Sequence, residues 1–413
     1  MANLNWLRPG LQLKRWVVLI CFGLFVAIIG AIIFGLRFFG ALETGSSLLV
    51  TPYYFLSAVL IGGGGSAIFI GVYRLVRHIE KILKRSHENR SLSEIALAQI
   101  EQGPKLVCVG GGTGLNRLLS GLREHSNRIT AVVSVADDGG SSGRLRNEFG
   151  MLPPGDIRNC LSALANAGDT MGALMQYRFA EGELAGHAFG NLLLMVLMKV
   201  TGDFGQAVRE ANHILNVRGQ VLPVSLDYVT LVATHPDGTK TTGQKNVARC
   251  GKPIAELTLK PEPGAPPADV LAAIAEADAI ILGPGSLFTS VLPNLLLPAV
   301  AAAIADSPAK VIYVVNTANQ PGETPNFAVN DYLSALKKHA PKLRIDVAIV
   351  NDYRPSPAKI ERLRGENRFL TEHVGRPADG VRLLFRDVVN RDRPEEHDVA
   401  KLAKAIMEEL AGK

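Results

Sequence analysis

A glycine-rich turn is the first segment of this 413-residue chain whose composition suggests a chemical use. Gly111, Gly112, Thr113 and Gly114 separate a short apolar run from leucines at helical spacing. Glycines let backbone N–H groups approach a ligand closely, and the start of a helix favours anions. The turn therefore predicts a phosphate-binding loop, although it is neither a Walker A loop nor a complete GxGxxG motif. A tight strand-to-helix turn without a ligand is the alternative.

Two adjacent acids, Asp137 and Asp138, end the next apolar run, which spans residues 129–136. In a dinucleotide-binding fold, an acid roughly 20 residues after the glycines binds ribose hydroxyls. Paired carboxylates also suit Mg²⁺, which prefers oxygen ligands. The pair therefore predicts a ribose contact or a magnesium site, and Mg²⁺ is the one cofactor that the sequence suggests. Two solvated acids in a mobile surface loop are the alternative.

The segment after these acids adds groups that suit phosphate oxygens. A nest of backbone N–H groups is expected at residues 139–143, together with the hydroxyls of Ser141 and Ser142 and the guanidinium of Arg144. With the two acids, the segment predicts one half of a site for a phosphorylated, ribose-bearing ligand.

Further candidates lie near predicted helix starts. Asp156 follows a Pro-Pro-Gly break and is a predicted N-cap, with Arg158 and Asn159 in the first turn, facing either the cleft or solvent. A structural and a ligand-binding role are equally expected for His187. The remaining candidates that would line the cleft are Asn191, which follows His187 at the same helix start, and Gly285 and Ser286 in a second Gly/Ser turn.

The elements that must position these residues alternate between apolar strands and helices. Strand-like runs at 279–283, 311–317 and 345–351 each lead into Gly, Ser, Asn or an acid. Ligands of open parallel sheets bind at the carboxyl ends of strands. The pattern predicts a Rossmann-like α/β fold with a mostly parallel sheet and a small β-rich insertion at 221–262.

Two apolar runs, Trp16 to Leu36 and Tyr53 to Tyr73, precede this body and are long enough to span a bilayer. Basic residues before the first run and after the second place both ends in the cytoplasm. We therefore expect a transmembrane hairpin at 1–73, a basic amphipathic linker at 74–103 and a cytoplasmic domain at 104–413. The linker could lie on anionic headgroups or be a solvated helix. The expected location is the inner membrane.

Charge and cysteine content exclude several classes of protein. The net charge is +6, but residues 1–103 hold 10 basic and 5 acidic residues, which leaves 34 and 33 in the body. No nucleic-acid partner is therefore expected. The four cysteines form no CxxC pair, which fits a reducing compartment. A homodimer is the commonest oligomer.

Five segments together resemble the YvcK family of gluconeogenesis factors, within the CofD-like superfamily. They read GGGTGLNRLLSGL, VADDGGSSGRLRNEFGMLPPGDIRNCL, HAFGNLLL, GPGSLFTSVLPNLL and NQPGET, in this order. The similarity begins near Lys105 and runs almost to the C-terminus, and the N-terminal hairpin lies outside the usual core.

The resemblance implies binding of a UDP-sugar, notably UDP-N-acetylglucosamine, by a regulator of carbon adaptation, cell-wall supply and cell shape. The CofD branch implies the alternative, an enzyme that transfers 2-phospholactate from a nucleotide-activated donor with Mg²⁺. We expect a binding protein rather than an enzyme, and an NAD-dependent oxidoreductase is disfavoured by the missing third glycine. Two positions depart from similar chains: Glu396 stands where an arginine is common, and Leu363 lies in a segment where a tyrosine is common.

Overall fold

The computed structural model describes residues 14–44, 51–86, 103–166, 168–373 and 380–412. The chain divides into two compact units, Met1–Glu101 and Gln102–Lys413. Each unit has its own internal packing, and we describe them one at a time.

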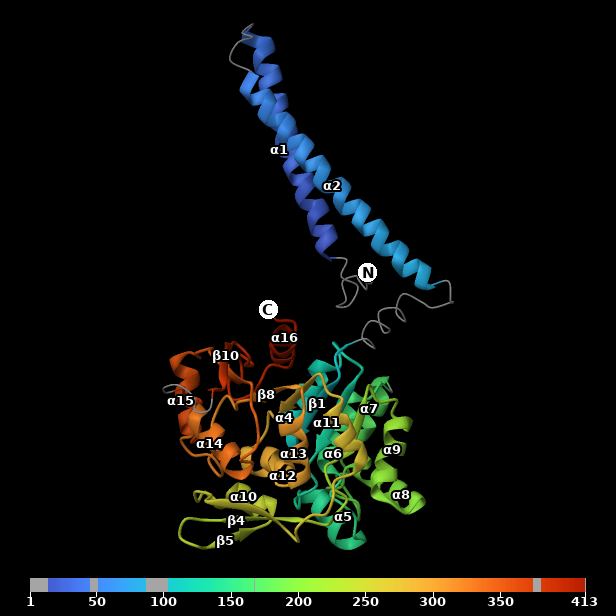
Figure 1. Cartoon of the computed structure of the whole chain (residues 1–413), viewed down its shortest axis with the longest axis vertical. Helices are drawn as coiled ribbons and strands as arrows, with labels where there is room; N and C mark the ends of the chain where they lie inside the picture. The colour runs from blue at the N-terminus through green and yellow to red at the C-terminus, as the bar shows by residue number, and fades with distance from the viewer. Residues whose placement is uncertain (1–13, 45–50, 87–102, 167, 374–379, 413) are drawn as a thin grey trace. The chain divides into compact units, whose positions relative to one another are not determined.

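The N-terminal unit is a pair of long helices, α1 (Lys14–Thr44) and α2 (Thr51–Ser86) (Figure 1). Val18–Leu36 and Phe55–Arg74 are long and apolar enough to cross a membrane. Glycines let the two backbones approach, because a Cβ on Gly64 would lie 2.7 Å from the backbone nitrogen of Ala27. Large apolar side chains such as Phe25 and Phe69 face outward. Apolar side chains on the outer surface of a helix pair are expected where lipid covers the helices.

The boundary predicted after Tyr73 is not a break in the structure. Helix α2 continues without interruption to Ser86, so the first half of the predicted linker is an extension of the second apolar helix. The rest of that linker, residues 87–102, lies outside the described residues.

The second unit is built on a seven-stranded sheet in which every neighbouring pair is parallel. The strand order is β10-β9-β8-β7-β1-β2-β3. The strands are β1 (Leu106–Gly110), β2 (Ile129–Val133), β3 (Gln220–Pro223), β7 (Ala279–Leu282), β8 (Lys310–Val314), β9 (Val347–Asn351) and β10 (Arg382–Arg386). The central strands are buried along their whole length because helices cover both faces. The predicted α/β fold is confirmed.

The order of the strands places a switch point between β1 and β7. The chain leaves β1 in one direction through β2 to β3, and later returns to the other side of β1 and proceeds from β7 to β10. Connections on either side of such a point diverge and leave a crevice at the carboxyl ends of the two strands. Both glycine-rich turns of the sequence directly follow these two strands.

Helices connect the strands and supply the second half of the core. They are α4 (Gly112–Leu122), α5 (Gly140–Phe149), α6 (Gly155–Leu164), α7 (Gly168–Gln176), α8 (Phe189–Thr201), α9 (Phe204–Ile214), α11 (Ala268–Ala275), α12 (Leu292–Leu295), α13 (Pro298–Asp306), α14 (Val329–His339), α15 (Pro357–Gly365) and α16 (Val399–Leu410), with a π-helical turn at Leu287–Val291. Helix α4 forms as predicted, since Leu115, Leu118, Leu119 and Leu122 bury one stripe.

The β-rich insertion is smaller than predicted. An antiparallel sheet of order β5-β4-β6 comprises β4 (Thr230–Thr234), β5 (Lys240–Thr242) and β6 (Glu256–Lys260), with helix α10 (Gln244–Cys250) between the last two. The prediction that the insertion starts at residue 221 is wrong. Val221, Leu222 and Pro223 are all buried and continue the parallel main sheet beside β2, so they belong to the core.

Candidate functional site

A cavity of about 610 Å³ lies where the switch point predicts a crevice. Its floor comes from the turns after β1 and β7, its far side from the segment after β8, and its rim from the C-terminal segment and helix α10. We call it the main cavity, and it is lined by Gly111–Gly114, Arg117, Gln244, Ala248, Pro284–Ser286, Thr289, Ser290, Asn316–Glu323, Arg368 and Glu395–His397.

The two glycine-rich turns meet at the floor of this cavity. A Cβ on Gly114 would lie 2.5 Å from the carbonyl oxygen of Pro284, so no larger residue fits there. Gly112 (φ +65°) and Gly283 (φ +75°) adopt left-handed backbone conformations that glycine tolerates best. No side chain caps α4, and the first N–H groups of a helix have no partner within it. The floor can therefore offer to an anion the backbone N–H groups of Gly111, Thr113, Gly114, Gly285 and Ser286, whereas the Gly112 N–H donates to Asp156.

The far wall is held against these turns by side-chain hydrogen bonds. Asn316 donates to the carbonyl oxygen of Gly285 (2.9 Å), and the amide of Gln320 donates to Ser286 Oγ (2.8 Å). Glu323 is buried and accepts from Phe288 N (3.2 Å) and Thr289 Oγ1 (2.6 Å). Burial raises the pKa of Glu323, while these donors oppose the shift.

The C-terminal segment closes one side of the cavity through ion pairs. Glu396 contacts Arg117 (2.6 Å) and Arg393 (2.9 Å), so the guanidinium of Arg117 is already neutralised at the rim. His397 is buried next to them. Burial, reinforced by the charge of Arg117, lowers its pKa to about 4 against a hydrogen bond to the Val315 carbonyl. The imidazole is therefore neutral at pH 7.

Several polar atoms in the cavity wall have no partner. Among the described residues, Thr317 Oγ1, Gln320 Oε1 and His397 Nε2 are buried and make no hydrogen bond. A buried polar group without a partner costs about 1–3 kcal/mol. All three belong to residues that line the cavity, where a polar ligand could supply the missing bonds.

Helix α10 of the insertion forms part of the same wall, a role that the sequence did not reveal. Lys245 N donates to Asp138 Oδ1 (2.9 Å), and the Gln244 amide donates to the Thr289 carbonyl (3.1 Å). Gly251 N donates to the carbonyl of Gly322 (3.3 Å) at the other end of the helix. The insertion is therefore tied to the segments that follow β2, β7 and β8.

The adjacent acids Asp137 and Asp138 do not converge on one point. Asp138 is engaged by the start of α10, whereas Asp137 accepts from Gly139 N (2.9 Å) and from the Ser142 hydroxyl. The charge of Asp137 helps to raise the pKa of Asp156, and the charge of Asp138 in turn helps to raise the pKa of Asp137. No group of three or more potential metal-ligating side chains occurs within the described ranges.

Asp156 lies directly behind the glycine floor. Its carboxylate accepts from Gly112 N, and a Cβ on Gly111 would lie 2.7 Å from its Oδ2. The predicted N-cap role is wrong: α6 begins at Gly155, so Asp156 is in its first turn. Burial, with the charge of Asp137, raises the pKa of Asp156 to about 6, although the Gly112 N–H and Arg158 oppose this.

The other predicted residues form a buried network beside Asp156 rather than a wall of the main cavity. Ser141 Oγ contacts His187 Nδ1 (3.0 Å) and accepts from the Asn191 amide (3.0 Å). Ser142 Oγ accepts from Gly155 N (3.1 Å), because both serines lie in the first turn of α5 instead of in the predicted loop. These contacts place His187 in a buried hydrogen-bond network.

Two predicted arginines have different environments. Arg158 is buried and donates to the Asn159 side chain (2.6 Å). Arg144 is exposed and donates to the carbonyl of Ala185 (2.9 Å), away from the main cavity. The structure therefore brings the glycine turns and Asp156 together and leaves Arg144 at the periphery.

The residues missed by the sequence analysis as site residues come from strand ends and from the tail. Asn316 to Glu323 follow β8, and the strand-end rule could have found them. Arg117 and Glu395 to His397 carry no motif of their own. Leu363, where similar chains often have a tyrosine, is buried in α15 and lines a second cavity of about 580 Å³ together with Tyr353.

We expect Asp156→Asn to remove a pH dependence from folding. The folded-state pKa of about 6 lies above the ordinary value of 3.8, so the wild type loses stability as pH rises from about 4 to about 6. The gap between 3.8 and about 6 corresponds to about 3 kcal/mol, so the variant should gain about 2–3 kcal/mol of stability over the wild type between pH 4 and pH 8. Urea unfolding of both proteins between pH 4 and pH 8 measures the difference. A constant difference across this range would contradict the assignment.

Comparison with known proteins places the chain in a family. The model of 2-phospho-L-lactate transferase CofD matches residues 106–389. A relative from Nostoc sp. (strain PCC 7120) is 40% identical over 427 residues, covering 99% of this chain and 92% of its own. The gluconeogenesis factor of Bacillus subtilis (strain 168) is 47% identical over 251 residues, covering 60% of this chain and 79% of its own. The crystal structure of BH3568 from Bacillus halodurans superposes with a TM-score of 0.70 at 39% identity, covering 74% of this chain and all of that one.

The parallel sheet and its paired glycine turns define the class as an open α/β protein with a cavity at the switch point. The match extends over most of the second unit, and the Nostoc relative covers the N-terminal unit as well. The chain belongs to the CofD family and, within it, to the gluconeogenesis factors of the YvcK family.

Proposed function

We propose that the main cavity binds a nucleoside diphosphate sugar, with UDP-N-acetylglucosamine as the first candidate. The observation that carries the proposal is the meeting of two glycine turns at the switch point, where Gly114 packs on Pro284. Two such turns supply N–H donors from both sides of a cavity, which suits a diphosphate better than a single phosphate. The bound state would report on carbon adaptation, cell-wall supply and cell shape.

The unpartnered atoms of the wall support a sugar as the other part of this ligand. Thr317 Oγ1, Gln320 Oε1 and the neutral His397 Nε2 can exchange hydrogen bonds with hydroxyls but carry no charge. The neutralisation of Arg117 by Glu396 also limits the positive charge at this end of the cavity. The phosphates would therefore lie over the glycines and the sugar toward the tail.

The second candidate is transfer of a phospholactate-type group, which the match to the CofD model favours. Asp137 and Asp156 are two interacting carboxylates behind the glycine floor. Such a pair could hold Mg²⁺ next to a diphosphate. A regulator remains our first choice because similar proteins from Bacillus subtilis and Halalkalibacterium halodurans are named gluconeogenesis factors.

We also propose that the protein resides in the inner membrane, with the second unit in the cytoplasm. The support comes from the two apolar helices and from the basic residues that flank them.

Calorimetric titration of the full chain in lipid nanodiscs tests the proposed ligand. UDP-N-acetylglucosamine should bind saturably, whereas NAD should not. Thr317→Val keeps the shape but removes one unpartnered hydroxyl, so it should weaken UDP-N-acetylglucosamine about tenfold and leave UDP unchanged. If GDP bound and UDP-sugars did not, the result would instead favour the transferase. If Thr317→Val lowered the affinities for UDP and for UDP-N-acetylglucosamine equally, the sugar would not contact Thr317.

A further inference from the structure

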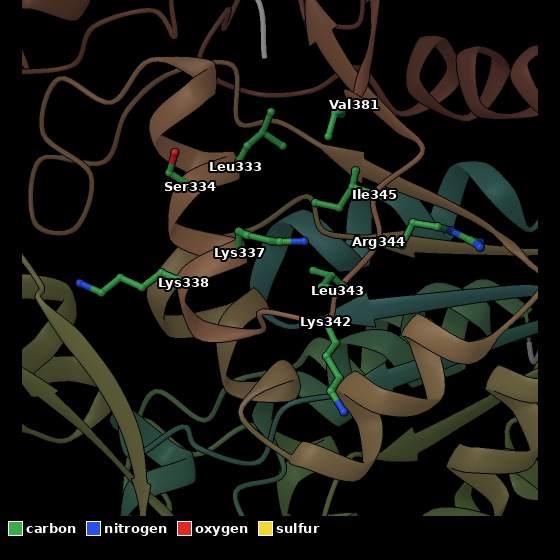
Figure 2. Close-up of a pocket in the computed structure, with 9 residues that line it drawn as sticks. All are labelled: Leu333, Ser334, Lys337, Lys338, Lys342, Leu343, Arg344, Ile345 and Val381. Carbon is green, nitrogen blue, oxygen red and sulfur yellow. The ribbon is translucent and has the colours of Figure 1, made fainter. Parts of the chain in front are cut away.

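A basic pocket of about 440 Å³ lies outside the site described above (Figure 2). It is formed by the end of α14, the segment leading into β9 and the residue before β10. Its lining residues are Leu333, Ser334, Lys337, Lys338, Lys342, Leu343, Arg344, Ile345 and Val381. Figure 2 shows Lys337 extending from α14 toward the segment that carries Ile345 and Arg344.

The pocket concentrates positive charge in a unit that is nearly neutral. Four of its nine lining residues are cationic and none is acidic. Arg344 pairs with Asp346 (3.1 Å), but within the described part of the chain the three lysines have no ion pair. The dipole of α14 accounts for lysines in its last turn. It does not account for Lys342, which lies beyond the helix end at His339.

The floor of the pocket is apolar. Leu333, Leu343 and Val381 are buried, and Ile345 is half-buried. A fully hydrated anion such as inorganic phosphate needs no apolar surface. A phosphate ester with an apolar substituent matches both the rim and the floor, because lysine ammonium groups attract the phosphate while the floor covers the substituent.

The position of the pocket indicates which phosphate ester would reach it. Lys342 to Ile345 and Val381 directly precede β9 and β10, so the pocket lies at the amino edge of the sheet, opposite the main cavity. The chain enters the second unit at this same edge, at Lys105 before β1. Three strand spacings separate β9 from β1, which is about 14 Å. The first described residues of the second unit therefore lie at the same edge of the sheet as the pocket.

We propose that this pocket binds the phosphate headgroup of an anionic membrane lipid and docks the second unit on the bilayer by its amino edge. The main cavity, at the carboxyl edge, then opens away from the bilayer. The inference rests on the proposed membrane location and is independent of the ligand in the main cavity.

The test uses the full chain in nanodiscs of phosphatidylcholine, with or without 30% phosphatidylglycerol. Hydrogen–deuterium exchange should be at least threefold slower for residues 333–346 in the discs that contain phosphatidylglycerol. The triple variant Lys337→Gln, Lys338→Gln and Lys342→Gln should lose this protection. The control variant Lys199→Gln, Lys240→Gln and Lys404→Gln changes the net charge equally at other exposed lysines and should keep it. Unchanged exchange of the buried strands β1 and β7 would show that both variants are folded.

Three results would overturn the proposal. One is equal exchange in both kinds of disc. Another is the same protection by 10 mM inorganic phosphate in pure phosphatidylcholine discs, which would make this a site for a free anion. The third is a chain that does not co-elute with the discs, since the tether would then be absent. Failure of UDP-sugar binding with protection intact would count only against the proposed ligand.

Discussion

Gly114→Ala should lower the affinity for the nucleotide ligand by about 100-fold or more. The new methyl group would lie 2.5 Å from the carbonyl oxygen of Pro284 and 3.1 Å from Gly285 Cα, so the two glycine turns must separate. Loss of two charge-assisted hydrogen bonds from N–H groups to phosphate costs about 3 kcal/mol, which corresponds to this factor. Calorimetry gives the affinity directly.

Gly172→Ala is the matched control for this experiment. Gly172 is also a helical glycine, in α7, but nothing lies within 4 Å of the position that its Cβ would occupy. The same substitution should therefore leave affinity unchanged and stabilise the fold by about 0.5–1 kcal/mol. If both alanine variants bind like the wild type, the contact between the turns does not shape the site.

Glu323→Ala should lower the free energy of unfolding by about 2–5 kcal/mol. The substitution leaves Phe288 N and the Thr289 hydroxyl without an acceptor in a buried position. Each orphaned donor costs about 1–3 kcal/mol, and the empty space adds to this. Ligand affinity should fall as well, because these bonds hold the segment after Ser286 against the cavity wall. Urea unfolding, followed by titration of the folded fraction, separates the two effects.

Glu323→Gln distinguishes the hydrogen bonds from the charge. Glutamine keeps the size and one acceptor oxygen but presents an amide to the second donor, so an intermediate loss of about 1–2 kcal/mol is expected. A variant as stable as the wild type would mean that Glu323 is already protonated at neutral pH, in keeping with its raised pKa. A loss equal to that of alanine would show that the carboxylate charge itself is required.

The architecture could be predicted from the sequence because strands and helices are marked by short, local patterns of apolar residues. Apolar runs such as residues 279–282 are buried on both faces and can be recognised as parallel strands without tertiary information. The assignment of Val221 to Pro223 to the insertion was wrong for the same reason. A short apolar strand has the same sequence pattern in a main sheet as in an insertion. Only its pairing with β2 decides between them.

The candidate site was predictable where glycines mark it and unpredictable where contacts across the sheet create it. Nothing in the sequence shows that Glu396 pairs with Arg117, about 280 positions away, or that Asp156 faces Gly112. The orientation of Asp138 toward Lys245 likewise depends on how the insertion folds back. These contacts join segments that are distant in sequence, and no spacing rule encodes them.

Helix α10 has a consequence for how this family can diversify. It packs on the small sheet β5-β4-β6, and its residues Gln244 and Ala248 line the main cavity. Substitutions in the insertion can therefore reshape the mouth of the cavity while β1, β7 and their glycines stay constant. A change of ligand preference would then need neither a new scaffold nor a new phosphate floor.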